Sequence, residues 1–153
     1  MIAEKKRIAI LGSTGSIGTQ SLEVIAAHPD AFEVEVLTAQ QNAPLLVEQA
    51  RRFKPNAVVI GNEEHYPFVK SQLSNTDVKV YTGENALSAV VQMDSVDLVL
   101  TALVGYSGLG PTIKAIEAGK PIALANKETL VVAGELITRL AHEKGVNIFP
   151  VDS

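Results

Sequence analysis

One stretch near the start of the chain constrains the fold more than any other. Residues 11–18 read Leu-Gly-Ser-Thr-Gly-Ser-Ile-Gly; a short apolar run at 7–11 leads into them, and apolar residues at helical spacing follow as far as Pro29. Strand, glycine turn and helix, in this order, are how a dinucleotide-binding βαβ unit begins. The glycine spacing is G-x-x-G-x-x-G, one residue longer than G-x-G-x-x-G, and an ordinary tight turn would also use glycine. The flanking strand and helix therefore carry the prediction of a nucleotide-binding turn.

Each glycine of this turn has its own expected role. Gly12 lets the chain turn sharply off the strand, and Gly18 allows the helix to pack close to it. Gly15 has no Cβ, so a pyrophosphate can approach the backbone there. The free N–H groups and the positive dipole end of the helix would face that anion.

The rest of the chain alternates strand-like and helical segments. We expect strands at 7–11, 32–39, 57–60, 78–81, 97–101, 121–124 and 147–151, and helices at 17–28, 42–53, 65–73, 84–92, 109–118 and 128–144. This alternation predicts an α/β fold that is doubly wound and Rossmann-like, with a mostly parallel sheet of about seven strands and helices on both faces. Ligands bind such sheets beyond the carboxyl ends of the strands. The segments at those ends are 12–18, 39–42, 102–110, 125–128 and 152–153.

Composition narrows the class of protein. The chain has 153 residues, of which 46% are hydrophobic and 20% charged, which is typical of one soluble globular domain. A net charge of -4 argues against a nucleic-acid partner, and no apolar run is long enough to cross a membrane. The chain has no cysteine, which excludes disulfides and thiolate zinc sites and fits a reducing compartment. We therefore expect a cytoplasmic protein.

The end of the second strand bears on cofactor choice. NAD-binding domains usually place an acidic residue there, about 20 residues after the glycines, to bind the ribose hydroxyls. This chain has Gln40, Gln41 and Asn42 instead. No carboxylate is present to repel a 2′-phosphate, which favours NADP over NAD. Asn42 also fits the cap of the next helix, and the two glutamines also fit a solvated loop.

A polar cluster, Ala-Asn-Lys-Glu at 125–128, follows another apolar strand at the same expected edge. Lys127 is suited to a phosphate or a hydroxyl, and Glu128 to a ribose or an amide. Helix capping by Asn126, with Glu128 near the helix dipole, explains the same residues, and spacing alone favours that alternative.

Two more segments remain open between functional and structural interpretations. Asp152, at the end of the last strand, suits a hard divalent cation, but one carboxylate does not make a metal site and a solvated terminus is the alternative. The glycine-rich residues 104–111 fit either a cofactor contact or a flexible turn before a helix.

The motifs at 12–18 (Gly-Ser-Thr-Gly-Ser-Ile-Gly), 124–128 (Leu-Ala-Asn-Lys-Glu) and 150–153 (Pro-Val-Asp-Ser) together resemble the 1-deoxy-D-xylulose 5-phosphate reductoisomerase family. The resemblance covers the whole chain but only the family's amino-terminal domain, so it implies an NADPH-binding Rossmann-like domain at 1–153. The family isomerises 1-deoxy-D-xylulose 5-phosphate, by retroaldol cleavage or alkyl shift, and reduces the product with NADPH to 2-C-methyl-D-erythritol 4-phosphate in the non-mevalonate isoprenoid pathway. The resemblance also implies a requirement for Mg²⁺, Mn²⁺ or Co²⁺, a sugar phosphate substrate and a homodimer.

Roles for single residues follow from this resemblance. It implies cofactor contacts at Gly12, Thr14, Gly15, Ser16, Ile17, Gln40, Gln41, Asn42, Asn126 and Glu128. Within this set, the segment from Thr14 to Ile17 would meet the phosphates, and the segment from Gln40 to Asn42 the adenosine ribose and its 2′-phosphate. It implies substrate contacts at Lys127 and Ser153, and a metal ligand at Asp152.

The chain departs from the family pattern in two ways. Family members often have Gly followed by Lys or Arg where this chain has Gln40 and Gln41, and without that positive charge the 2′-phosphate is held less tightly. We therefore expect a preference for NADPH over NADH by a reduced margin. The chain also stops before the Glu that follows in the family's metal motif and before the domains that complete the substrate pocket, so we expect cofactor binding without turnover.

Two other classes stay open on sequence alone. One is the cofactor domain of another two-domain NADP oxidoreductase, such as a semialdehyde dehydrogenase, which would need a nucleophilic cysteine from a later segment. The other is a non-catalytic nucleotide-sensing domain.

Overall fold

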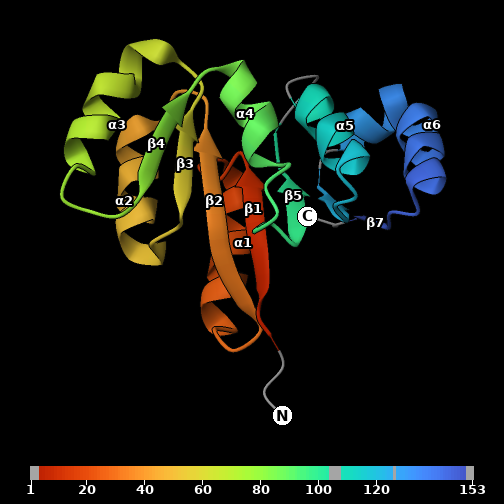
Figure 1. The fold of residues 1–153 in the computed structure, drawn as a ribbon, viewed down its shortest axis with the longest axis horizontal. Coiled ribbons are helices and arrows are strands. Elements are labelled where there is room, and N and C mark those ends of the chain that lie inside the picture. The colour runs from red at the N-terminus through yellow and green to blue at the C-terminus, as the bar shows by residue number, and fades with distance from the viewer. Residues whose placement is uncertain (1–3, 104–107, 126, 151–153) are drawn as a thin grey trace.

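The computed structural model describes residues 4–103, 108–125 and 127–150, with the backbone alone for 127–133 (Figure 1). The strands are β1 (Lys6–Leu11), β2 (Phe32–Ala39), β3 (Ala57–Ile60), β4 (Lys79–Thr82), β5 (Leu98–Thr101), β6 (Ile122–Leu124) and β7 (Ile148–Pro150). The helices are α1 (Ser16–Ala27), α2 (Ala43–Phe53), α3 (Tyr66–Gln72), α4 (Glu84–Val90), α5 (Leu109–Glu117) and α6 (Lys127–Lys144), with a short 3₁₀-helix, η1 (Glu63–His65), before α3.

The strands form one parallel sheet in the order β4-β3-β2-β1-β5-β6-β7. This confirms the predicted fold class, and each strand lies within one residue of its predicted bounds. The helix ends differ by up to two residues, and η1 was not predicted. Asn62 starts η1, because its side chain accepts a hydrogen bond from the Glu64 N–H at 3.0 Å.

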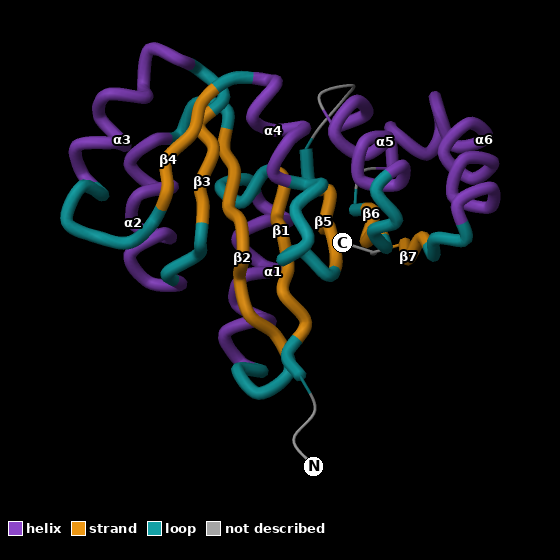
Figure 2. Tube along the Cα trace, viewed as in Figure 1, coloured by secondary structure: helices purple, strands orange, loops and turns teal. Residues whose placement is uncertain are grey.

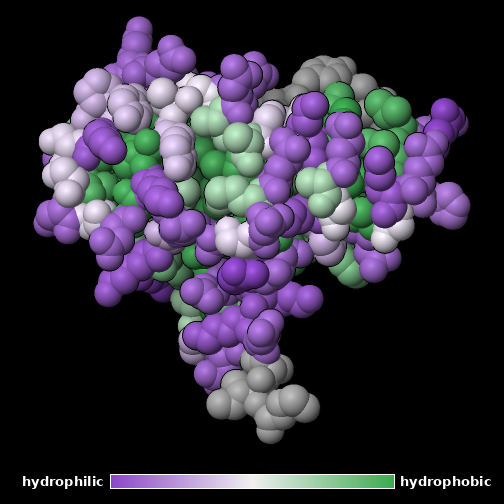
Figure 3. All heavy atoms as spheres, in the orientation of Figure 1, coloured by the Kyte–Doolittle hydropathy of each residue, from purple (hydrophilic) through white to green (hydrophobic). Residues whose placement is uncertain are grey.

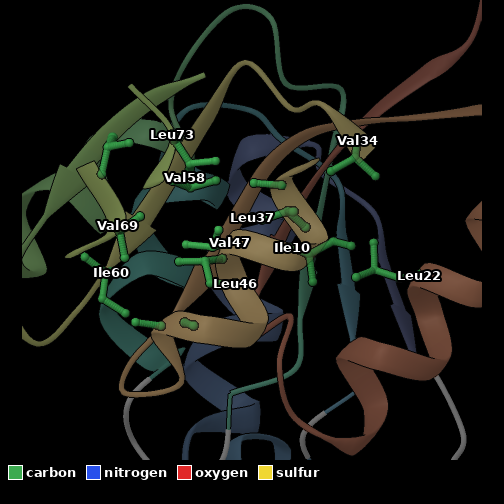
Figure 4. Close-up of a cluster of buried hydrophobic side chains, with 14 of the residues drawn as sticks. Ile10, Leu22, Val34, Leu37, Leu46, Val47, Val58, Ile60, Val69 and Leu73 are labelled. Atoms are coloured by element: carbon green, nitrogen blue, oxygen red, sulfur yellow. The ribbon is translucent and has the colours of Figure 1, made fainter. Parts of the chain in front are cut away.

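Helices cover the sheet from both sides and enclose two apolar cores. The core on one face receives side chains from α1, α2 and α3, and Figure 4 shows Leu22, Leu46 and Val69 from these helices packed against the strands. The core on the other face receives side chains from α4, α5 and α6. β1 contributes to both cores, because successive side chains of a strand point to opposite faces.

An extra residue in β2 changes this alternation. Ile8 pairs with Val34, but the next residue, Ala9, pairs with Val36, so the register shifts by one at Glu35. Val34 and Val36 therefore lie in opposite cores although they are two residues apart. Such a bulge adds local twist to the strand pair.

An ion pair ties β1 to β5 at the ends where both strands begin. Asp97 Oδ2 accepts from the Arg7 backbone N–H at 2.9 Å and from Arg7 Nε at 3.2 Å. Partial burial acts to raise the pKa of Asp97, but the hydrogen bonds and the charge of Arg7 outweigh it, so this pKa lies below its ordinary value. Hydrophilic residues dominate the surface around the beginnings of β1 and β2 (Figure 3).

None of the helices in the described part of the chain is both long and apolar enough to span a bilayer.

Candidate nucleotide site

The carboxyl ends of the strands meet at one edge of the sheet, as predicted. The last residue of β1, Leu11, pairs with Thr101 of β5, and on the other side Ala39 of β2 pairs with Ile60 of β3. Figure 2 shows the turns after β2, β3 and β4 together at the top of the view. β1 lies between β2 and β5, and the helices that follow these two neighbours cover opposite faces of the sheet. A crevice at such a switch point is where open α/β sheets bind ligands.

The glycine turn lies at this switch point. Gly12 has a φ of +85°, which L side chains rarely adopt, and a Cβ there would lie 3.0 Å from Leu103 Cδ2. A Cβ on Gly18 would overlap the carbonyl oxygen of Gly12, so α1 packs as closely as predicted. Gly15 has an ordinary φ of -80°, and among the described residues a Cβ there would meet only the Gly12 oxygen, at 4.0 Å. The space beside Gly15 is therefore open to a ligand.

The first turn of α1 has no cap of its own. Gly15 is the N-cap residue and no side chain caps the helix. Among the hydrogen bonds between described residues, none uses the backbone N–H of Thr14, Gly15 or Ser16. Gly15 and Ser16 are exposed, and Thr14 and Ile17 are half-buried. Free amides at the positive end of a helix dipole form an anion-binding site.

Ser13, the residue before these amides, forms hydrogen bonds to the interior of the protein instead. Ser13 is fully buried, and its N–H donates to the Thr38 carbonyl at 2.8 Å. Its hydroxyl donates to Gln49 Oε1 at 2.7 Å, and Gln49 Nε2 donates to the Ser13 carbonyl at 2.9 Å. Sequence reasoning missed Gln49, although a polar residue three positions after Leu46 on the apolar face of α2 was a usable signal.

The residues after β2 are held by neighbouring turns. Asn42 caps α2, because its Oδ1 accepts from the Leu45 N–H at 3.3 Å, which confirms the capping interpretation. Gln41 is exposed, as a residue of a solvated loop is, and its Oε1 also accepts from Asn62 Nδ2 at 2.8 Å. Gln40 lies over Gly61, where a Cβ would overlap its side-chain amide. Neither Asn62 nor Gly61 was picked out from sequence.

A cavity of about 600 Å³ opens beside these turns. It is lined by Gln40, Gly61, Glu63, Gly83, Glu84, Leu87 and Leu103. Leu103 also borders the glycine turn, so the cavity continues the crevice from the end of β5 toward β3 and β4. The described lining carries two carboxylates and no basic side chain.

Several predicted site residues lie outside the described part of the chain. They are Asn126, Asp152 and Ser153, and the segment 104–107 lies outside it as well. α6 begins at Lys127, one residue before its predicted start, and the side chains of Lys127 and Glu128 are not described. The described residues contain no group of three or more His, Asp or Glu suited to a metal ion.

Comparison with known proteins then decides the family. A family model described as 1-deoxy-D-xylulose 5-phosphate reductoisomerase matches residues 8–134. The chain belongs to this family. Membership of the reductoisomerase family argues against the alternative that this chain is the cofactor domain of a semialdehyde dehydrogenase.

Curated relatives agree with this assignment. The 1-deoxy-D-xylulose 5-phosphate reductoisomerase of Phocaeicola vulgatus is 62% identical to this chain over 149 residues. That of Bacteroides fragilis is 61% identical to it over 150 residues. The matches cover 97% and 98% of this chain but 39% of each relative. The chain thus spans about two fifths of the length of these reductoisomerases.

Solved structures of the family share the fold. The reductoisomerase of Zymomonas mobilis in complex with NADPH superposes with a TM-score of 0.92 at 37% identity, over 98% of this chain and 39% of that one. A reductoisomerase in complex with magnesium superposes with a TM-score of 0.90 at 34% identity, over 96% of this chain and 37% of that one.

Proposed function

We propose that this chain is the NADPH-binding domain of a 1-deoxy-D-xylulose 5-phosphate reductoisomerase. The observation that carries the proposal is the uncapped start of α1, where exposed amides face an open space beside Gly15. These groups fit a pyrophosphate, which would bind at Thr14, Gly15, Ser16 and Ile17 on a turn shaped by Gly12. The NADPH complex of the Zymomonas mobilis relative supports the choice of cofactor.

The adenosine end of the cofactor would lie beside the turn after β2. Gln40, Gln41 and Asn42 would contact the ribose and its 2′-phosphate. Asn42 Nδ2 has no partner among the described residues, so it is available as a donor. Asn126 and Glu128 would hold the cofactor from the β6 turn.

We expect this chain to bind NADPH more tightly than NADH by a modest margin. Substituting Gln41→Arg should lower the Kd for NADPH roughly threefold to tenfold, because a guanidinium pairs well with a phosphate. The Kd for NADH, which has no 2′-phosphate, should change by less than about twofold on the same argument. Calorimetric titration of both cofactors measures these values.

Gln92→Arg is the matched control, because it adds the same charge to an exposed glutamine near the end of α4. It should leave both dissociation constants unchanged. No NADPH binding by the unmodified chain would refute the proposed function. Tighter NADH than NADPH binding would refute the cofactor preference.

In the full-length enzyme, we propose that the β6 and β7 turns face the substrate. Lys127 and Ser153 would contact the sugar phosphate, and Asp152 would be one ligand of a divalent cation such as Mg²⁺. When bound, such a cation would polarise substrate oxygens as a Lewis acid. The chemistry of these residue types supports the assignment, since a carboxylate suits a hard cation and an ammonium suits a phosphate. We also propose a homodimeric assembly for the full-length enzyme, which the family resemblance supports.

We also propose that this chain alone binds cofactor without turnover. A Mg²⁺ or Mn²⁺ site combines several oxygen ligands, whereas Asp152 offers one carboxylate. Without the rest of the pocket, the reacting carbon would not be held against the nicotinamide.

Turnover is tested by NADPH absorbance in the presence of 1-deoxy-D-xylulose 5-phosphate and Mn²⁺. The assay compares this chain with a full-length reductoisomerase relative into which its 153 residues have been exchanged. The exchanged full-length protein should consume NADPH and the short chain should not. NADPH consumption by the short chain would show that the proposed active site is in the wrong place. No NADPH consumption by either protein would count against the proposed enzyme activity.

A further inference from the structure

We infer that Gln49 is a positioning residue that holds the glycine turn in its phosphate-binding conformation. Gln49 lies on α2, is 7% exposed, and bonds to two atoms of Ser13 at once. This inference rests on the proposed function, because the turn matters only if a phosphate binds there.

The geometry requires a side-chain amide. The Ser13 carbonyl can only accept, so it must face the Nε2 group of Gln49. The Ser13 hydroxyl lies 2.7 Å from Gln49 Oε1 and 3.2 Å from the Thr38 carbonyl oxygen, and it donates its one hydrogen to the nearer Oε1, so the same amide must also accept. An ionised glutamate would place an acceptor against the carbonyl, and methionine would leave both Ser13 atoms without this partner.

The link to the binding site runs through one peptide group. The Ser13 carbonyl and the Thr14 N–H belong to the same planar trans unit, so they point in opposite directions. Gln49 fixes the carbonyl toward the interior, which directs the Thr14 N–H toward the open side of the turn. Gln49 would thus orient an amide that it does not touch.

The helix that carries Gln49 is firmly seated. Its neighbours Leu46 and Ala50 are buried in the core. Asn42 caps the same helix at the other side of the proposed cofactor site. α2 therefore places Gln49 against the turn with little freedom to move.

The test compares the unmodified chain with Gln49→Met, which keeps the side-chain length and removes both bonds. We expect the Kd for NADPH to rise at least tenfold, which is about 1.4 kcal/mol. In the free protein, ¹⁵N relaxation should show greater mobility at the Thr14 and Ser16 amides. Ser13→Ala keeps the Gln49 bond to the Ser13 carbonyl and should produce a smaller loss in the same direction, which covers the case in which Gln49→Met does not fold.

Thr76→Val is the control for the loss of a partly buried side-chain hydrogen bond at the opposite end of the sheet. The Thr76 hydroxyl donates to the Leu73 carbonyl at 2.7 Å, and its loss should leave both the Kd and the turn amides unchanged. Normal NADPH affinity in a folded Gln49→Met protein would overturn the inference while the proposed function stands. If the unmodified chain binds no NADPH, the proposed function fails. Unchanged relaxation of the turn amides in the Gln49→Met protein would overturn the inference, whatever the result for the proposed function.

Discussion

Gly15→Val should weaken NADPH binding at least about a hundredfold, because it places a branched side chain where the pyrophosphate is proposed to lie. The lost contacts are hydrogen bonds to charged oxygens, worth roughly 1.5–3 kcal/mol each, and two of them correspond to a hundredfold or more. The fold should tolerate the change, since φ at Gly15 is -80° and a Cβ there has one neighbour, at 4.0 Å, in the described part of the chain. Valine is a poorer N-cap than glycine, so the free energy of unfolding should fall by only about 1 kcal/mol.

The measurement is a calorimetric titration with NADPH, with circular dichroism to verify folding. Ala27→Val, at the exposed far end of α1, is the matched control and should bind NADPH normally. If the Gly15→Val protein kept its affinity, the pyrophosphate would have to bind elsewhere along the edge of the sheet.

Gly18→Ala, three residues further along the helix, should act on stability instead. The added Cβ would lie 2.7 Å from Ser13 Cα and 2.8 Å from its carbonyl carbon, and these backbone atoms cannot rotate away. Helix α1 would have to move off the turn, and overpacking of this kind costs on the order of 3 kcal/mol. NADPH binding should weaken as well, because the displaced atoms belong to the phosphate-binding turn.

Urea denaturation followed by circular dichroism measures this loss. Gly110→Ala is the matched control: Gly110 also lies in the first turn of a helix, α5, and no atom of the described residues lies within 4 Å of its added Cβ. That substitution should be neutral or slightly stabilising, since alanine is favoured over glycine in helices. Equal stability of the Gly18→Ala and unmodified proteins would contradict the close packing of α1.

Gly12 and Gly18 show how much of the site could be predicted from sequence. A positive φ at Gly12 and a close approach at Gly18 follow from the order of strand, turn and helix, because that geometry recurs wherever a βαβ unit begins. The cap at Asn42 could be predicted for a similar reason, since a helix start needs only local residues. Strand bounds followed from apolar runs, which are continuous where a strand is covered on both faces.

The remaining features depend on contacts between distant segments. Gln49 is 36 residues from Ser13 and Asn62 is 21 residues from Gln41, and no local pattern reports such pairs. The bulge at Glu35 likewise results from the pairing of β2 with β1, whereas the local alternation Glu-Val-Glu-Val at 33–36 would place both valines on the same face. The cavity depends on Gly61 and Gly83, which directly follow β3 and β4 and come together only when the sheet assembles.

The central place of β1 has a consequence for synthesis of the chain. β1 to β4 pair in the order in which they are made, but the second edge of β1 waits for β5, and the pair Arg7 and Asp97 is 90 residues apart. At translation rates of about 5–20 residues per second, this delay is roughly 5–18 seconds. A parallel pairing over such a distance also closes slowly, because the loop entropy is lost before the contacts form. The nascent protein therefore carries its glycine turn for many seconds before the strand that completes the crevice has been translated.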